Sequence, residues 1–250
     1  MTVYFIGAGP GAADLITVRG QRLLGSCPVC LYAGSIMPDD LLALCPADAR
    51  IVDTGPLTLD QIIDELAEAD AAGKDVARLH SGDPSIYSAL TEQCRRLDAL
   101  GIDYQVVPGV PAFAAAAAAL GRELTVPGVA QTVTLSRVAT LSTAMPPAED
   151  LRTLSAAGGT LVLHLAAAQI DNIVPELLAG GYQAETPCAV VAFASWPEEV
   201  VLRGTLADIA AQMHDAGVTR TAVIVIGDVL AAEGTDSYLY SSGRVRRGRH

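Results

Sequence analysis

Short apolar runs alternate with amphipathic segments along the first half of the chain. The runs have the length and composition of buried strands, and they span residues 3–6, 29–32, 50–53, 75–80 and 104–107. The segments between them carry apolar residues on one face, which predicts helices, among them 58–72 and 87–100. Asp14 is expected to cap the first of these helices. Strands that alternate with helices predict a mainly parallel sheet in an α/β domain.

The pattern changes after an alanine-rich helix at 114–120, where Pro127-Gly128 interrupts the chain. Further strands are predicted at 132–136, 160–165, 188–193 and 221–226, with one more at 199–204. These elements predict a second, unlike α/β domain. We therefore divide the chain into a first domain at 1–114, a second at 115–233 and a tail at 234–250.

The composition narrows the class of protein. Apolar residues make up 51% of the chain, which excludes a disordered protein, and the net charge of -12 argues against a nucleic-acid partner. No run of about 20 apolar residues predicts a membrane span. The N-terminus lacks the basic and apolar regions of a signal peptide, so we expect a cytoplasmic protein. The arginines at 244, 246, 247 and 249 belong to the tail.

Cys27 and Cys30 form a CxxC pair, the spacing of redox motifs and of zinc ligands. The pair lies where one element ends and the next strand begins, without a second ligand pair. The histidines are scattered along the chain. We therefore interpret both cysteines as reduced core residues and expect no metal site.

The loop Gly7-Ala8-Gly9-Pro10-Gly11-Ala12 follows a strand and fits the dinucleotide fingerprint G-x-G-x-x-A. Two features oppose that interpretation. The second strand ends without the acidic residue that would hold a ribose, and Pro10 lacks the N–H that a pyrophosphate needs. A nicotinamide-dependent oxidoreductase therefore remains one hypothesis for the function. Isothermal titration of a nicotinamide cofactor against the protein would test it.

Three motifs, each after a predicted strand of the first domain, are more specific together. They are the first loop with Asp14–Gly20, the stretch Ser81-Gly82-Asp83-Pro84-Ser85-Ile86-Tyr87, and Val107-Pro108-Gly109-Val110-Pro111-Ala112. In this order they resemble the tetrapyrrole methylase family, and the similarity extends through most of the chain. Without that resemblance, Asp83 is more simply interpreted as a turn residue that caps the following helix.

The resemblance implies two unlike α/β domains with a cofactor cleft between them, and a homodimer. It implies S-adenosylmethionine as the methyl donor, S-adenosylhomocysteine as its product and a small tetrapyrrole as substrate. The residues that would line the cofactor in the first domain are Gly82, Asp83, Ile86, Tyr87, Pro111 and Ala112. Those in the second domain are Leu165, Ala192, Thr221 and Ala222. Pro10 would border the tetrapyrrole.

One further segment narrows the branch of the family. Residues 129–137 with Met145-Pro146-Pro147 resemble members that methylate C-11 of a corrin precursor. The alternatives within the family are a cobalt-bearing form of that precursor and the siroheme-type, diphthamide and ribosomal-RNA members. Because that substrate carries several carboxylates, Arg19, Arg122 and Arg137 are candidates to bind it. Methyl transfer from a sulfonium needs orientation more than acid or base chemistry. No catalytic residue is assigned, and His80 is interpreted as structural although it adjoins the Gly82 loop.

Overall fold

The computed structural model describes residues 1–139 and 144–234. The chain folds into two compact units, which are described separately. The first consists of Met1–Ala115 and Phe193–Glu199. The second consists of Ala116–Ala192 and the described part of Val200–His250. The chain therefore enters the first unit again at Phe193–Glu199 and continues in the second unit from Val200.

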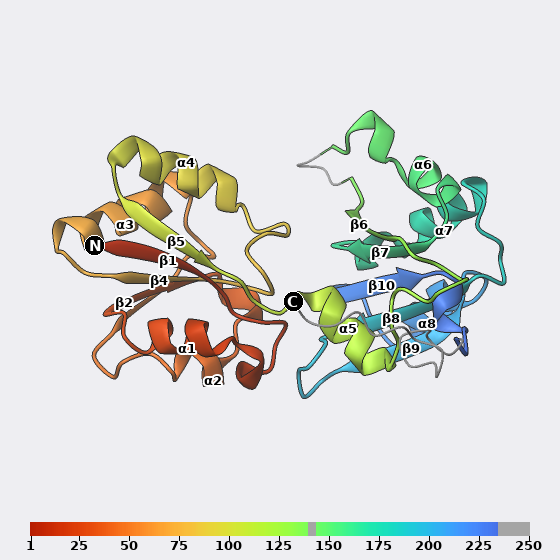
Figure 1. Ribbon diagram of the computed structural model, residues 1–250, viewed down its shortest axis with the longest axis horizontal. Helices are drawn as coiled ribbons and strands as arrows, with labels where there is room; N and C mark the ends of the chain where they lie inside the picture. Colours follow the sequence, from red (N-terminus) through yellow and green to blue (C-terminus); the bar gives the residue numbers. More distant parts are fainter. Residues whose placement is uncertain (140–143, 235–250) are drawn as a thin grey trace, which may run out of the picture. The chain divides into compact units, whose positions relative to one another are not determined.

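The first unit is built on a five-stranded sheet in the order β3-β2-β4-β1-β5 (Figure 1). Every pairing in it is parallel, as the alternation of strands and helices predicts. The strands are β1 (Thr2–Gly7), β2 (Val29–Tyr32), β3 (Arg50–Asp53), β4 (Val76–His80) and β5 (Asp103–Val107). The helices are α1 (Val18–Leu24), α2 (Asp39–Leu42), α3 (Leu59–Ala71), α4 (Leu90–Leu100) and the start of α5 (Ala112–Leu120).

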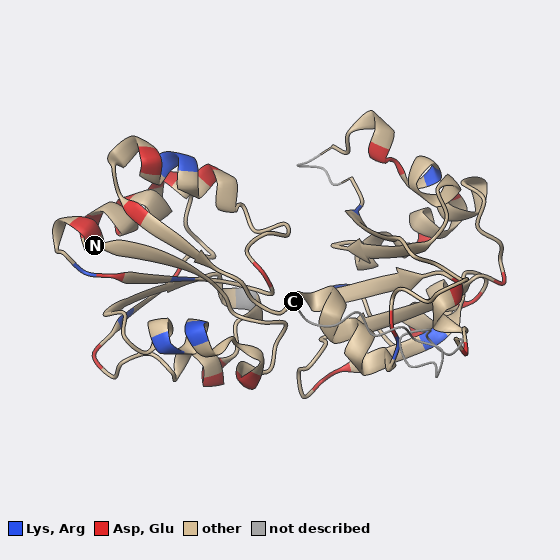
Figure 2. Cartoon of the chain, viewed as in Figure 1, with Lys and Arg blue, Asp and Glu red and all other residues tan. Residues whose placement is uncertain are grey.

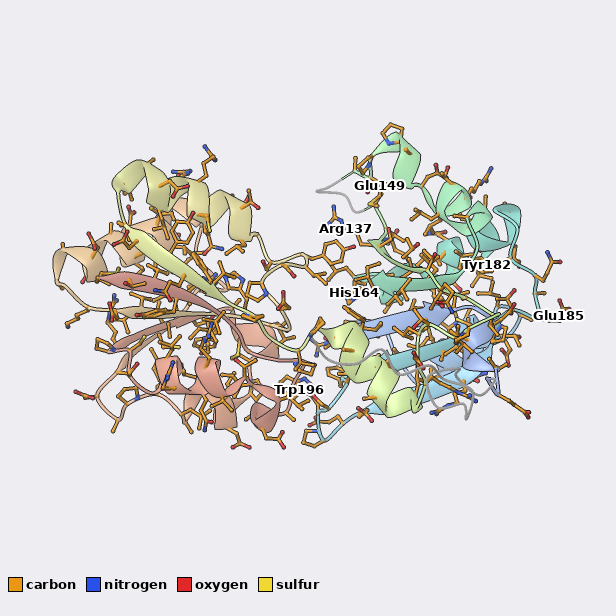
Figure 3. The ribbon with its side chains drawn as sticks, in the orientation of Figure 1. Arg137, Glu149, His164, Tyr182, Glu185 and Trp196 are labelled. Atoms are coloured by element: carbon orange, nitrogen blue, oxygen red, sulfur yellow. The ribbon has the colours of Figure 1, made fainter. Side chains whose placement is uncertain are left out.

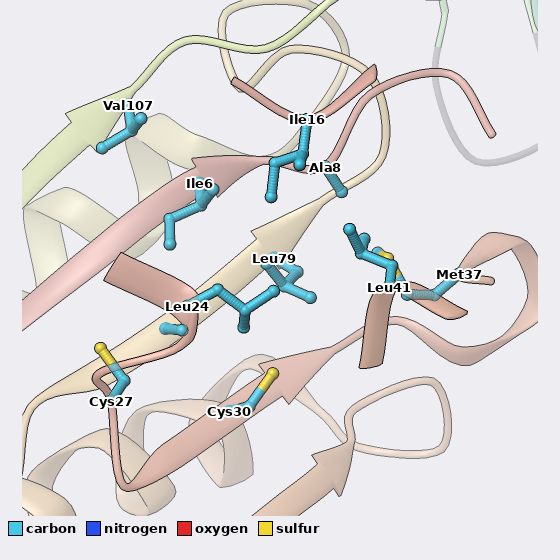
Figure 4. Packing of buried hydrophobic residues seen from close by; sticks show 11 residues of the cluster. Ile6, Ala8, Ile16, Leu24, Cys27, Cys30, Met37, Leu41, Leu79 and Val107 are labelled. Atoms are coloured by element: carbon cyan, nitrogen blue, oxygen red, sulfur yellow. The ribbon is translucent and has the colours of Figure 1, made fainter. Parts of the chain in front are cut away.

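Both faces of the central strands β1, β2 and β4 are buried, and successive side chains of each strand point to opposite sides. Ile6 and Leu79 face α1 and α2 in the cluster drawn in Figure 4. Phe5 faces α3 and α4 together with Leu66 and Leu97. Each fully buried side chain of this size contributes about 1.5–3 kcal/mol to folding. The apolar clusters on the two faces of the sheet fix the positions of the strand ends, and the loops of the candidate site follow these ends.

The second unit is built on a five-stranded mixed sheet in the order β6-β7-β10-β8-β9. Its strands are β6 (Val133–Arg137), β7 (Thr160–His164), β8 (Pro187–Ala192), β9 (Val200–Thr205) and β10 (Ala222–Ile226). Its helices are α6 (Leu151–Ala156), α7 (Ile170–Ala179) and α8 (Ile209–Asp215), with most of α5. Only the β6–β7 pairing is parallel among these strands. The prediction of two unlike α/β domains is confirmed.

Two sequence-based helix boundaries are wrong. Asp14 lies in a short 3-10 turn, and the first helix begins at Val18 with the Thr17 hydroxyl accepting from the Gly20 N–H. The helix expected from residue 87 begins at Leu90, because Tyr87 and Ala89 have φ of 52° and 56°. Left-handed backbone at non-glycine residues cannot continue a right-handed helix.

Most charged residues lie on the helices and the connecting segments, and most strand positions are uncharged (Figure 2). This distribution agrees with the burial of the central strands, such as β4 in the first sheet and β10 in the second. Within the described residues, no helix is long and apolar enough to cross a membrane.

Candidate functional site

The three predicted motifs meet at one edge of the first sheet. β4, β1 and β5 are parallel neighbours, so the loops that follow them emerge side by side. Their glycines pack backbone against backbone. A Cβ on Gly7 would lie 2.5 Å from the Cα of Gly109, and a Cβ on Gly109 would lie 2.2 Å from the carbonyl oxygen of Gly82. Glycine is therefore needed here for close approach of the chains.

Asp83 joins the loop at 81–87 and the loop at 107–112, here called the second and third loops. Its Oδ2 accepts from the Gly109 N–H at 2.7 Å, and its Oδ1 accepts from the Ser85 N–H at 2.8 Å and from the Ser85 hydroxyl. Burial alone would raise the pKa of this carboxyl, but the bonds from Ser85 and Gly109 lower it below its ordinary value. Asp83 is therefore ionised at neutral pH. Its carboxylate fixes the geometry of the packed backbone at Gly7, Gly82 and Gly109, here called the Gly82 cradle.

The remaining first-unit candidates lie around this cradle. Pro111 and Ala112 pass close to Gly82, whose Cβ would lie 3.6 Å from the Pro111 Cα. Ile86 is half-buried, and its N–H donates to the Asp83 carbonyl at 3.3 Å. Tyr87 follows with 47% of its surface exposed and a left-handed backbone. Strained backbone of this kind persists where the surroundings impose it, and it clusters at binding loops.

Three backbone N–H groups of the first loop donate to other parts of the protein. The N–H groups of Ala8 and Gly9 donate to the carbonyls of His80 and Gly82, and the Ala12 N–H donates to the Ser195 hydroxyl. Pro10 has no N–H. A dinucleotide pyrophosphate needs such groups free at the start of a helix. The geometry therefore argues against the oxidoreductase alternative.

A buried arginine and a buried histidine lie beneath the second loop. Burial lowers the pKa of Arg78 to about 10, and its guanidinium donates to Gln93 at 3.1 Å and to Thr54 at 3.0 Å. His80 is 6% exposed. Burial, and then the charge of Arg78, lower its pKa to about 3. Its Nε2 has no hydrogen-bond partner within the described residues. His80 is therefore neutral in the folded protein, and its lowered pKa makes it a weak base.

The second-unit candidates share one edge of the second sheet. Ala222 pairs with Ala192 where β10 begins and β8 ends, and Leu165 directly follows β7, which is antiparallel to β10. Leu165 and Thr221 have φ of 54° and 52°. A positive φ is unusual for a non-glycine residue, and it is a clear outlier for a β-branched one such as Thr221. Leu165 is 61% exposed, which is high for a large apolar side chain.

The three candidate arginines have different surroundings. Arg19 is exposed on α1 of the first unit, and Arg137 is half-buried at the end of β6 of the second (Figure 3). Within the described residues, neither forms an ion pair. Arg122 instead donates to the Ala232 carbonyl at 2.9 Å, which gives it a structural partner.

Cys27 and Cys30 are both buried in the core of the first unit (Figure 4). Burial raises the pKa of Cys27 to about 12. A hydrogen bond with Cys45, and then burial, raise the pKa of Cys30. Buried neutral thiols are poor nucleophiles. In the part of the chain that the structure describes, no group of three or more Cys, His, Asp or Glu side chains is placed to hold a metal ion.

Sequence reasoning missed Trp196 and Ser195. The Trp196 indole Nε1 donates to the Pro10 carbonyl at 3.1 Å, and Ser195 receives the Ala12 N–H at 2.9 Å. These contacts join residues more than 180 positions apart in the sequence, so no local pattern reveals them. The one available signal was composition, since Trp196 is the chain's single tryptophan.

A separate cavity of about 460 Å³ lies in the second unit. Gly159, Gly227 and Thr186 line it, and each adjoins the end of a strand opposite to the Leu165 and Thr221 edge. Figure 3 shows Arg137 and His164 at one end of this sheet and Tyr182 and Glu185, which also line the cavity, at the other. The candidate cofactor residues therefore do not belong to this cavity.

The chain belongs to the Tetrapyrrole (Corrin/Porphyrin) Methylases, whose family model matches residues 2–210. A relative from Mycobacterium tuberculosis H37Rv, a precorrin-4 C(11)-methyltransferase, is 80% identical over 98% of each chain. The crystal structure of a cobalt precorrin-4 methyltransferase is 38% identical, with a TM-score of 0.89 over 92% of this chain and 95% of that one. A uroporphyrin-III C-methyltransferase from Thermus thermophilus, complexed with S-adenosylhomocysteine, is 30% identical, with a TM-score of 0.78 over 92% and 93%.

Proposed function

We propose that this protein transfers a methyl group from S-adenosylmethionine to C-11 of precorrin-4, giving precorrin-5 in cobalamin biosynthesis. The observation that carries the proposal is the 80% sequence identity to the Mycobacterium tuberculosis enzyme over 98% of each chain. The lower identity to the cobalt precorrin-4 methyltransferase favours the metal-free substrate. Both substrates have the same carboxylate side chains, so the cobalt form is the second candidate.

The first unit supplies a cradle that suits the cofactor. Gly7, Gly82 and Gly109 let the three loops pack backbone against backbone, which brings the candidate cofactor residues of the first unit together. S-adenosylmethionine carries no phosphate, so the engagement of the Ala8, Gly9 and Ala12 N–H groups within the protein does not count against it. Asp83 holds the cradle in shape through Ser85 and Gly109. Gly82, Ile86, Tyr87, Pro111 and Ala112 are the first-unit residues that we propose to contact the cofactor.

The second unit supplies candidate cofactor residues at strand ends where the backbone has positive φ angles. Leu165 and Thr221 are held in left-handed conformations, which turns their peptide groups in directions that ordinary strand ends do not reach. We propose that these two residues, with Ala192 and Ala222, contact the adenosine portion. The exposed apolar surface of Leu165 suits the flat face of an adenine ring.

The cofactor supplies an activated methyl group on a sulfonium, and the substrate carbon is already nucleophilic within its conjugated system. The protein's contribution is then orientation of the two partners. The titratable groups beside the cradle are consistent with a protein that orients the reactants and supplies no acid or base. Asp83 is committed to hydrogen bonds within the loops, and His80 is buried and neutral. We assign neither as an acid or base.

Arg19, Arg137 and the loop at Pro10 are the residues that we propose for the tetrapyrrole. A chain with a net charge of -12 repels a polycarboxylate at long range, so binding must rest on close ion pairs. Both guanidiniums are available for this, since neither forms an ion pair inside the part of the chain that the structure describes.

A paired binding and turnover experiment tests the proposal. S-adenosylhomocysteine and NADH are titrated against the purified protein, and radiolabelled S-adenosylmethionine is then incubated with precorrin-4 or cobalt-precorrin-4. We expect binding of S-adenosylhomocysteine alone and faster methylation of precorrin-4. Binding of NADH without S-adenosylhomocysteine would overturn the proposal. Faster methylation of cobalt-precorrin-4 would establish the second candidate.

We also propose that the protein works in the cytoplasm and that it forms a homodimer, the second of which the family resemblance supports. Light scattering after size-exclusion chromatography tests the assembly. We expect twice the chain mass of 25.8 kDa, and a species of one chain mass would contradict the dimer.

A further inference from the structure

The segment Phe193–Glu199, here called the strap, lies against the loop that we assign to the tetrapyrrole. It starts directly after β8, yet it packs in the first unit. Trp196 Nε1 donates to the Pro10 carbonyl at 3.1 Å, and the Ala12 N–H donates to the Ser195 Oγ at 2.9 Å. Both halves of the first loop are therefore held, because its start is already bonded to the His80 and Gly82 carbonyls.

The contact between Trp196 and Gly11 is closely fitted. A Cβ on Gly11 would lie 2.2 Å from the indole Cδ1 and 2.3 Å from Nε1. A methyl group at this position therefore cannot coexist with the observed indole. The ring is rigid and bonded to Pro10, so it would have to leave the loop.

The strap itself has an imposed conformation. Phe193 and Ser195 have φ of 51° and 67° although neither is glycine. The Ser195 N–H donates to a Glu199 carboxylate oxygen at 2.7 Å, and the Glu199 N–H donates to the Trp196 carbonyl at 3.1 Å. Backbone strain of this kind persists only where surrounding contacts enforce it. Here those contacts present the indole and the hydroxyl to the loop.

We propose that Trp196 is a positioning residue for the tetrapyrrole: the strap fixes Pro10–Ala12 in the conformation that receives the substrate. The inference rests on the proposed function, since that function makes the first loop a substrate wall. Affinity falls with the fraction of molecules whose loop is competent. Loss of the strap therefore raises the KM for the tetrapyrrole and leaves cofactor affinity unchanged.

Four variants test the proposal. Trp196→Ala removes the ring and its N–H, and Trp196→Phe keeps an aromatic ring without the donor. Gly11→Ala expels the indole from the opposite side of the contact. Glu198→Gln changes an exposed side chain of the same strap and is the matched control.

The first readout is hydrogen exchange of the peptide over residues 8–14 without ligand, and the second is steady-state kinetics. We expect faster exchange and about a tenfold higher tetrapyrrole KM in Trp196→Ala and Gly11→Ala, with a smaller effect in Trp196→Phe. Kd for S-adenosylhomocysteine should stay within about twofold of wild type. Gly11→Ala should add little in the Trp196→Ala background, because both act on one contact.

Unchanged exchange or unchanged tetrapyrrole KM in Trp196→Ala and Gly11→Ala would overturn the proposal. An equal loss of cofactor affinity would also overturn it, because that pattern indicates general destabilisation. A wild-type protein that methylates no tetrapyrrole would instead contradict the proposed function. The exchange measurement would then still establish whether the strap holds the loop.

Discussion

Replacing Asp83 by alanine removes the group that ties two site loops together. The carboxylate accepts from the Ser85 N–H, the Ser85 hydroxyl and the Gly109 N–H. Hydrogen bonds to a charged acceptor contribute about 1.5–3 kcal/mol each when buried, and Asp83 is only half-buried. We therefore expect Asp83→Ala to lower the free energy of unfolding by roughly 2–3 kcal/mol in total. Because the cradle at Gly82 loses its shape, S-adenosylhomocysteine should also bind more weakly.

Urea unfolding followed by circular dichroism gives the stability, and calorimetric titration gives the affinity. Ser85→Ala is the matched control, because it removes the hydroxyl and keeps both N–H bonds to Asp83. It should cost less than about 1 kcal/mol. The pKa of Asp83 is lowered in the folded state, so its contribution is full at neutral pH and is lost as the pH falls through that pKa. A stable Asp83→Ala variant, or one that melts early yet binds S-adenosylhomocysteine normally, would refute the reasoning.

Three further predictions concern the surroundings of the site. Arg19→Met and Arg137→Met should each weaken tetrapyrrole binding by roughly 1.5–3 kcal/mol, and Arg→Lys should recover only part; unchanged affinity on titration would make both residues structural. Burial lowers the pKa of His80 from its ordinary 6.5 to about 3 in the folded state, so protonation favours the unfolded chain and the free energy of unfolding falls as the pH drops from 6.5 towards 3. His80→Gln should remove about 2 kcal/mol of the loss between pH 8 and pH 5, measured by urea unfolding at both values; an unchanged pH slope would contradict this. Thr221→Gly relieves a left-handed β-branched residue and should raise stability by roughly 1 kcal/mol while weakening S-adenosylhomocysteine binding; tighter binding would show that the strain has no role in the site.

The sequence predicts the first sheet and its loops well, for a physical reason. Buried parallel strands are continuous apolar runs, and a glycine or proline ends each one, so Gly7, Gly82 and Gly109 mark adjacent strand ends. The mixed second sheet is harder to predict from the sequence, since strand order and direction depend on pairing between distant segments and not on local periodicity. The left-handed conformations of Tyr87, Leu165 and Thr221 leave no mark in residue type. The packing of the strap on the first loop likewise depends on tertiary contacts alone.

Where the methyl group goes is the most direct test of the central claim. S-adenosylmethionine labelled with ¹³C in its methyl group is incubated with purified precorrin-4 and the enzyme, and the product is examined by NMR. The account predicts a single labelled methyl group, attached to C-11, with S-adenosylhomocysteine formed in equal amount. Label at another carbon, or no label in the tetrapyrrole, would contradict it.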